Sequence, residues 1–114
     1  MTGFVHRELA DGRWGTLSLA EQLGNIGSEV SRALNWRERN PELVQRSLDR
    51  ALELFHLTLD DPRHRASLAR LREICRAREV LLDYVAGPNQ FGSTDATIRR
   101  YYDVFACAAT LLKR

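Results

Sequence analysis

The sequence has few of the residues and features that mark several classes of protein. It contains two cysteines and three prolines in 114 residues, and Lys113 is its only lysine. No apolar run approaches the roughly 20 residues that cross a bilayer, and the first residues include no apolar stretch of the kind that directs secretion. Cys75 and Cys107 lack the short spacing of a metal site. We therefore expect a cytoplasmic protein without membrane contact, with both thiols reduced and with no metal or other cofactor.

What the sequence does contain is typical of one globular domain. Hydrophobic residues make up 44% and charged residues 28%, which excludes the disordered class, and the length suffices to bury a core. A net charge of +2 is too small to indicate a nucleic-acid binder by itself. The basic residues are nearly all arginine, which a GC-rich genome explains as well as a need for forked hydrogen-bond donors.

Four stretches have the apolar spacing of helices, and none alternates long enough to be a strand. Ser18 and Glu21 have the spacing of a capping box, and Asn40 and Asp61 each precede a proline, a strong signal for a helix start. Ser93 or Thr94 caps the last stretch. We expect helices over residues 18–37, 41–59, 62–86 and from 93 or 94 to the end of the chain.

Short connections between four such helices make neighbours in the chain antiparallel. The predicted fold is therefore all-α, an antiparallel up-down-up-down four-helix bundle over residues 18–114 with an extended N-terminal arm over residues 1–17. The arm contains Phe4, Val5 and Trp14, which either pack over its own bundle or are exchanged with a partner chain.

Two glycines lie inside the first predicted helix. Gly24 and Gly27 form a row with Ala20 and Ser31, beside the apolar face. Glycine inside a helix costs about 1 kcal/mol relative to alanine, so its presence twice in one row needs a reason. We expect another backbone to approach the helix closely there.

The longest periodic pattern lies in residues 62–86 and predicts the buried face of that helix. Arg78 falls within this face, and a buried guanidinium needs a partner, for which Glu29 at the edge of the first apolar face is the candidate. Arg78 and Glu29 form either an ion pair that fixes which helices meet, or an anion or ligand site completed by Tyr101 or Tyr102. The predicted buried positions are His64, Leu68, Leu71, Cys75, Arg78, Leu82 and Val85.

Signals for catalysis are weak. Arg50 followed by His56 is similar to the pattern of HEPN-type ribonucleases, but Ala51 stands where that family usually has a polar residue. Six residues also place the two side chains about 120° apart on a helix. No glycine-rich phosphate loop, nucleophile elbow or helical metal spacing of histidines is present. We expect no catalytic residues and no enzyme.

Apolar residues that lie beside the main apolar faces of the predicted helices predict an interface. Leu43, Leu54 and Leu57 flank the face of the second helix, and Val104 and Leu111 repeat at a step of seven on the last one. They favour a homo-oligomer or a protein partner, although neighbouring helices of one broad core could also fill them.

Arginines suggest a second kind of partner. Arg65, Arg72 and Arg76 share the outer side of the third predicted helix and could contact phosphates along an RNA. Acidic Glu73 and Glu79 are interleaved with them, which is also typical of a solvated helix face. Nucleic-acid binding is therefore the alternative to protein association.

Two segments carry a resemblance. SLAEQLGNIGSEVSRALNW (residues 18–36) and REVLLDYVAGPNQFGSTDATIRRYYDVFACAA (residues 78–109) resemble a family of short bacterial helical proteins, which implies no particular activity. In architecture the chain is similar to the four-helix-bundle proteins encoded in ribosomal RNA intervening sequences and to the accessory proteins of diversity-generating retroelements. The latter resemblance implies a basic oligomer that engages reverse transcriptase and RNA.

These observations lead to one hypothesis and two alternatives. The leading hypothesis is a non-enzymatic helical-bundle protein that associates with itself or with a protein partner. The first alternative is an RNA-binding accessory bundle that uses the arginine-rich third helix, and the second is a HEPN-like ribonuclease.

Overall fold

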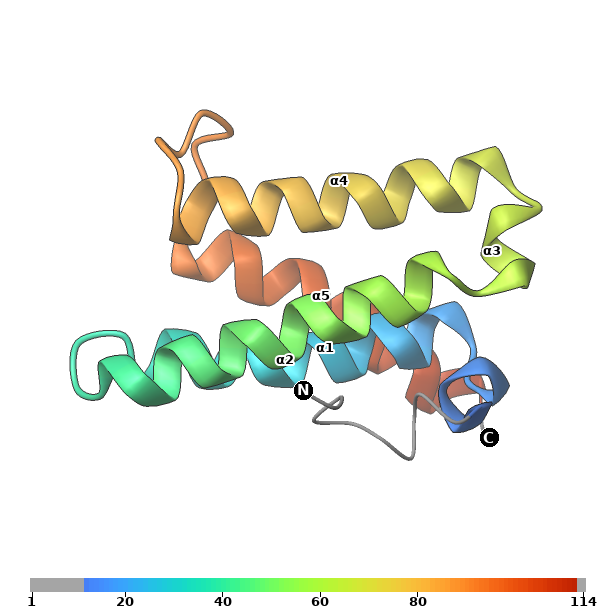
Figure 1. Cartoon of the computed structure of the whole chain (residues 1–114), viewed down its shortest axis with the longest axis horizontal. Helices are drawn as coiled ribbons and strands as arrows, with labels where there is room; N and C mark the ends of the chain where they lie inside the picture. The colour runs from blue at the N-terminus through green and yellow to red at the C-terminus, as the bar shows by residue number, and fades with distance from the viewer. Residues whose placement is uncertain (1–11, 113–114) are drawn as a thin grey trace, which may run out of the picture.

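The computed structural model describes residues 12–112, and every regular element in that range is a helix (Figure 1). Four long helices pack together, which confirms the all-α prediction. The elements are a short 3₁₀ helix η2 (Trp14–Thr16) and the α-helices α1 (Leu19–Asn35), α2 (Pro41–Leu59), α3 (Pro62–Arg65), α4 (Leu68–Val85) and α5 (Asp95–Leu112).

The predicted starts of the first two helices are confirmed by their hydrogen bonds. Ser18 Oγ accepts from the Glu21 N–H at 3.1 Å, and Glu21 Oε1 accepts from the Ser18 N–H at 3.0 Å. Asn40 Oδ1 accepts from the Leu43 N–H at 3.2 Å, and Pro41 takes the first position of α2. These contacts satisfy backbone donors that a helix leaves free at its start, so both starts are set locally.

The predicted single helix over residues 62–86 is wrong, because the chain forms two helices there. Asp61 caps α3, and Ser67 Oγ accepts from the Arg70 N–H at 3.3 Å and caps α4. A serine side chain that bonds the backbone two or three residues on competes with a continuous helix. The break separates His64 from α4, so the two no longer share one helical face.

α4 buries a different face from the predicted one. Its buried residues are Ile74, Ala77 and Leu81. Each lies one position before a predicted core residue, which corresponds to a rotation of about 100° around the helix axis. Of the predicted positions on α4, Leu71, Leu82 and Val85 are half-buried, whereas Leu68, Cys75 and Arg78 are exposed.

α1 lies at the centre of the molecule and packs against α2 on one side and α5 on the other. Its glycine row faces α5. A Cβ atom on Gly24 would lie 3.2 Å from the Ala106 Cα, and one on Gly27 would lie 2.5 Å from the Tyr102 Cβ. The close approach predicted from the two glycines is confirmed, and α5 is the helix that makes it.

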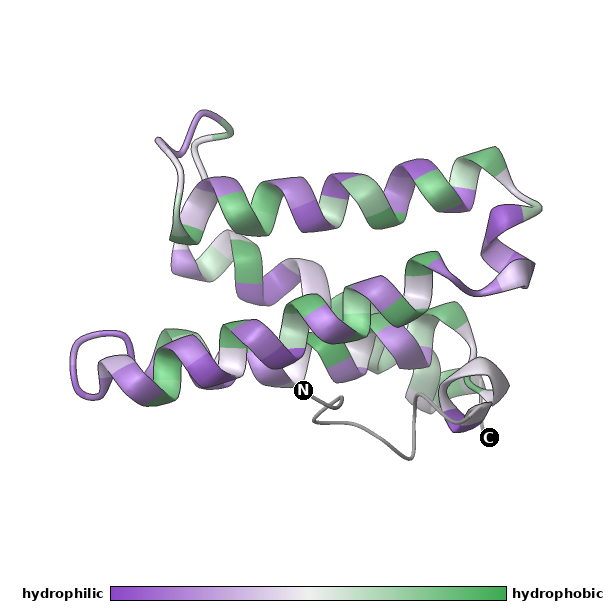
Figure 2. Cartoon of the chain, viewed as in Figure 1, coloured by the Kyte–Doolittle hydropathy of each residue, from purple (hydrophilic) through white to green (hydrophobic). Residues whose placement is uncertain are grey.

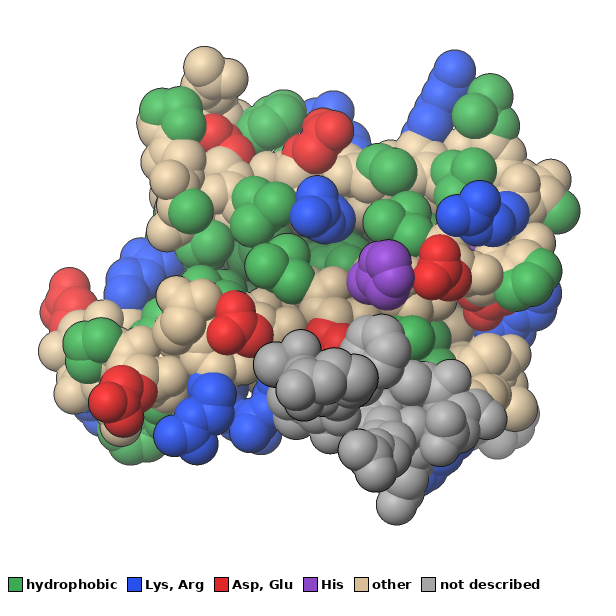
Figure 3. Space-filling view, in the orientation of Figure 1, with side chains coloured by type: hydrophobic (Ala, Val, Ile, Leu, Met, Phe, Trp, Pro, Cys, Tyr) green, Lys and Arg blue, Asp and Glu red, His purple; other side chains and the backbone are tan. Residues whose placement is uncertain are grey.

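Apolar residues from η2 and all four long helices form the core. Hydrophobic and hydrophilic residues alternate along each helix, as expected when one side is buried (Figure 2). Hydrophobic side chains also follow the junction between α4 and α2 on the face in Figure 3. The buried core residues are Trp14, Leu23, Ile26, Val30, Ala33, Leu34, Ala51, Leu54, Phe55, Ile74, Ala77, Leu81, Ile98 and Tyr102.

The connection before α5 is held by the end of α4. The Asp83 carboxylate accepts from the backbone N–H groups of Gln90 at 2.8 Å and Phe91 at 3.1 Å. The Phe91 side chain is 47% exposed. Asp83 fixes the backbone of the connection outside the core, where the Arg76 guanidinium lies over the Phe91 ring at 5.4 Å.

Most of the predicted arm, including Phe4 and Val5, lies outside the described residues. At its end, Trp14–Thr16 forms η2 instead of extended chain. Trp14 is buried in the core of its own chain, where its Nε1 donates to Thr58 Oγ1 at 3.0 Å.

Candidate functional site

The predicted pair of Arg78 and Glu29 does not form. Arg78 is exposed because of the rotation of α4, and the prediction that it is buried is wrong. Glu29 is buried at the α1–α2 junction, where its Oε1 lies 2.7 Å from Arg32 Nη1 and its Oε2 lies 3.8 Å from Arg50 Nη1. The charge of Glu29 is therefore balanced by arginines of α1 and α2.

The residues of the HEPN-like pattern take different partners. Arg50 turns towards Glu29, whereas His56 is exposed and its Nε2 lies 3.3 Å from Asp60 Oδ2. A shared catalytic site would require both side chains to face one substrate. Their geometry gives no support to the nuclease alternative.

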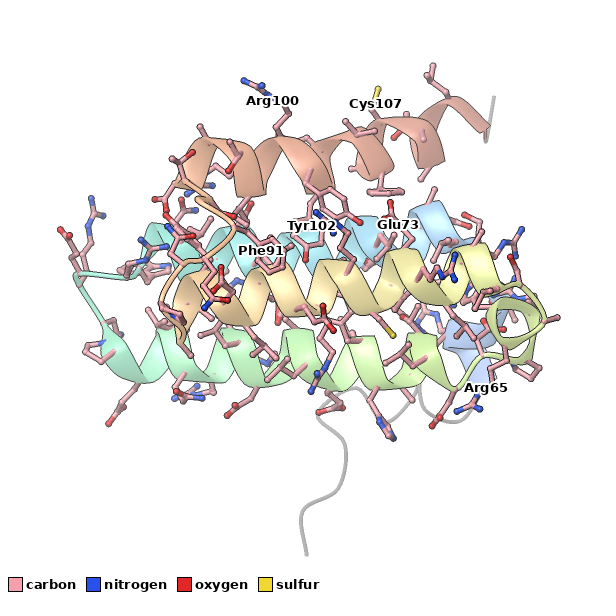
Figure 4. The ribbon with its side chains drawn as sticks, turned by 90° about the horizontal axis from the view of Figure 1, so that it is seen from above. Arg65, Glu73, Phe91, Arg100, Tyr102 and Cys107 are labelled. Atoms are coloured by element: carbon pink, nitrogen blue, oxygen red, sulfur yellow. The ribbon has the colours of Figure 1, made fainter. Side chains whose placement is uncertain are left out.

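The three arginines proposed for RNA contact are exposed but no longer share one helix. Arg65 belongs to α3, where it donates to the Leu59 carbonyl at 3.1 Å (Figure 4). Arg72 and Arg76 belong to α4, and Arg76 lies over the ring of Phe91. The break between α3 and α4 therefore divides the predicted basic face.

The predicted interface residues separate into three groups. Leu54 is 2% exposed and belongs to the core, so its assignment to an interface is wrong. Leu43 and Leu57 are half-buried. Val104 and Leu111 are each 60% exposed on α5. Of the predicted interface residues, only Val104 and Leu111, which form an apolar seam on α5, are exposed to solvent.

This seam continues through residues that our sequence reading did not select. Arg100, Asp103 and Cys107 are exposed on the same helix, and Figure 4 shows Arg100 and Cys107 pointing away from the other helices. Arg100 and Cys107 repeat at a step of seven, the spacing that had revealed Val104 and Leu111, so the signal was available. We call the five residues Arg100, Asp103, Val104, Cys107 and Leu111 the outer face of α5.

A cluster of buried polar side chains joins η2, α1 and α3. The Gln22 Nε2 donates to the Trp14 carbonyl at 2.9 Å and to Asp61 Oδ2 at 3.1 Å. The Gln22 Oε1 lies 2.7 Å from His64 Nε2 and, as an oxygen, can only accept, so the network assigns the imidazole proton to Nε2. Arg63 and Gln22 hold the pKa of the Asp61 carboxyl well below its usual range. These hydrogen bonds hold η2, α1 and α3 together in the interior, and His64 Nδ1 is the one atom of the cluster that is buried without a partner among the described residues.

We expect the free energy of unfolding to decrease as the pH falls below about 6.5, the usual pKa of an unfolded histidine. Burial lowers the pKa of His64 in the folded protein; Arg63 and Arg70 add to this effect and Asp61 opposes it. Below this pH, His64 therefore binds a proton more readily in the unfolded chain than in the folded chain. The slope from this one group is at most about 1.4 kcal/mol for each pH unit.

Urea unfolding between pH 7.5 and 5.5 measures this slope. The His64→Gln variant should lose the histidine component, whereas His56→Gln, which alters an exposed histidine, should retain it. Equal slopes for the wild-type and His64→Gln proteins would contradict the prediction.

Tyr101 and Tyr102, whose hydroxyls we expected to complete a site with Arg78, instead line a cleft between α4 and α5. The cleft has a volume of about 200 Å³. Both hydroxyl oxygens are buried. The Tyr102 hydroxyl has no hydrogen-bond partner among the described residues, whereas the Glu73 carboxylate lies beside the Tyr101 hydroxyl.

Comparison of the chain with protein-family models, curated proteins and solved structures finds no match. No helix within residues 12–112 combines the length and apolar content needed to cross a membrane. In the same range, no three histidine, cysteine or acidic side chains come close enough to hold a metal ion.

Proposed function

We propose that this protein functions by associating with a second copy of itself through the outer face of α5. The observation that carries the proposal is the 60% exposure of both Val104 and Leu111 on one helix face. Each square ångström of apolar surface removed from water contributes about 25 cal/mol, so pairing two such faces is favourable. In this proposal association is itself the activity, and no reaction is assigned to the protein.

The charges on the outer face favour a second copy as its occupant. Arg100 and Asp103 lie about one turn apart on this face. A two-fold dimer uses the same patch on both chains, so a patch with one charge of each sign can complement itself. If two α5 helices cross antiparallel between Arg100 and Val104, Arg100 of each chain meets Asp103 of the other. Val104 then packs against the aliphatic stem of the opposing Arg100.

We further propose that the four long helices are connected up-down-up-down, as their short connections favour. In this arrangement the outer face of α5 remains free for a partner. Val104 then contributes the apolar contact at the crossing point, Leu111 lies about two turns further along α5, and Arg100 and Asp103 set the orientation of the interface.

Charge reversal tests the proposal sharply. Arg100→Asp gives the outer face two negative charges, and Asp103→Arg gives it two positive charges. Each variant alone should raise the dissociation constant of the dimer at least about tenfold, because like charges then meet across the two-fold axis. An equimolar mixture of the two variants should form a heterodimer, and the chain carrying both reversals should again pair with itself. Sedimentation equilibrium at micromolar concentration measures all four cases.

The matched control is Arg46→Asp, which reverses an exposed charge on α2 and should leave association unchanged. A wild-type protein that stays monomeric throughout the micromolar range would contradict self-association. Dimers that persist equally in every charge variant would contradict the antiparallel pairing.

One observation keeps RNA binding as the alternative function. The guanidinium of Arg76 lies over the exposed ring of Phe91, and an arginine beside an exposed aromatic ring is a combination that single-stranded RNA can stack on. Retention on heparin at low salt, lost at moderate salt, would support this alternative. A protein that flows through heparin at low salt does not bind RNA in this way.

A further inference from the structure

The cleft between α4 and α5 has a mainly apolar surface, with several polar residues among those that line it. Ala77 and Val80 line it from α4, and Ile98 lines it from α5 beside Tyr101 and Tyr102. Its volume of about 200 Å³ is similar to that of an apolar cavity that accepts benzene in another protein. The cleft is therefore large enough for one small ring.

The Tyr102 hydroxyl makes this cleft different from a packing defect. Tyr102 is 4% exposed, and its hydroxyl is buried without a hydrogen-bond partner among the residues that the structure describes. Buried polar atoms in proteins are nearly always hydrogen-bonded, so an orphaned hydroxyl that lines a cavity indicates a missing partner. A ligand oxygen could fill this role.

The Tyr102 hydroxyl is available as a donor, whereas that of Tyr101 has the Glu73 carboxylate beside it as an acceptor. Burial raises the pKa of both tyrosines, and the Glu73 carboxylate adds to the increase at Tyr101, so both phenols stay protonated at neutral pH. Figure 4 shows Glu73 and Tyr102 extending into the space between α4 and α5. A protonated hydroxyl can donate to a carbonyl or hydroxyl oxygen.

The charges around the cleft favour an uncharged ligand. Glu73 and Arg76, which also line it, lie about one turn apart on α4 and carry opposite charges. The remaining lining is neutral, so a charged ligand would lose its hydration without gaining a free counter-charge.

We propose that the α4–α5 cleft binds a small, neutral ring compound whose hydroxyl or carbonyl oxygen accepts a hydrogen bond from Tyr102. The ring lies against Ala77, Val80 and Ile98. This site is separate from the outer face of α5, so it can operate whether or not the protein dimerises.

Phenol and toluene are the probes that test the proposal, because they have nearly the same shape and differ in the oxygen. Titrations of the full chain followed by amide NMR shifts should give phenol an affinity in the millimolar range and toluene a weaker one. Tyr102→Phe retains the ring that packs on Gly27 and removes only the hydroxyl. It should weaken phenol binding about tenfold and leave toluene binding unchanged.

Two controls locate the site. Tyr84→Phe removes a hydroxyl that hydrogen-bonds to Asp95 outside the cleft and should not alter phenol binding. Val80→Phe fills the cleft and should abolish binding of both probes. Nuclear Overhauser contacts between phenol and the Ile98 methyl groups identify the site without relying on a variant.

Three outcomes would overturn the proposal. The first is no binding of either probe at millimolar concentration, which would mean that the cleft holds only water. The second is equal affinity for phenol and toluene with no effect of Tyr102→Phe, which would mean that the hydroxyls take no part. The third is phenol binding that lacks contacts to Ile98, which would place the ligand elsewhere.

Discussion

Replacing Gln22 by leucine should lower the free energy of unfolding by about 3 kcal/mol. The Gln22 amide donates to the Trp14 carbonyl and to Asp61, and its oxygen accepts from His64. Leucine has a similar volume but leaves all three partners without that bond in the interior. A buried polar group that loses its partner costs about 1–3 kcal/mol, and the charge of Asp61 adds to the loss. Urea unfolding at pH 7.5 measures the effect.

Gln45→Leu is the matched control. Gln45 also lies on a helix and donates to Asp49 at 2.9 Å, but on the exposed side of α2. Its replacement should change the free energy of unfolding by no more than about 0.5 kcal/mol. Equal effects of the two substitutions would show that the buried cluster contributes no more than a surface hydrogen bond, against our prediction.

Replacing Gly27 by alanine should cost about 2 kcal/mol, although alanine is the better helix former. The new Cβ would lie 2.5 Å from the Tyr102 Cβ, an atom fixed to the backbone of α5, so the two helices must separate. The gain of about 1 kcal/mol in helix propensity offsets only part of this overpacking. Chemical denaturation measures the net loss.

Two other glycines provide a graded comparison. At Gly24 the new Cβ would lie 3.2 Å from the Ala106 Cα, so the loss from Gly24→Ala should be smaller than at Gly27. At Gly15 no heavy atom lies within 4 Å of the new Cβ, so Gly15→Ala should be neutral or slightly stabilising. A Gly27→Ala protein as stable as Gly15→Ala would contradict the close packing of α1 and α5.

Features encoded by neighbouring residues were predictable from the sequence. The capping box at Ser18 and Glu21 and the Asn40-Pro41 start need only the residues beside them, and both are confirmed. The glycine row of α1 was also informative, because glycine inside a helix is costly enough to require a tertiary reason. What the row could not specify was that α5 is the helix that approaches.

The face of α4 was not predictable in the same way. Leu71, Cys75 and Leu82 form one apolar row, and Ile74 and Leu81 lie on the adjacent one. Packing against α2 selects the second row, and the break at Ser67 permits it. Because the row of Ile74 and Leu81 is buried, Arg78 is exposed, and the predicted Arg78 site does not form. The unpartnered hydroxyl of Tyr102 depends on the distance between α4 and α5, which no local pattern contains.

The central position of α1 has a consequence for the order of folding. Its contacts with α2 join helices that are neighbours in the chain. Its contacts with α5 join helices that are separated in the chain by α2, α3 and α4. During synthesis the α1–α2 hairpin can therefore form early, but the glycine row of α1 stays exposed to water until α5 has left the ribosome. Chains that stop before α5 would expose the side of α1 that carries the glycine row. A chaperone or a neighbouring nascent chain would bind this surface first.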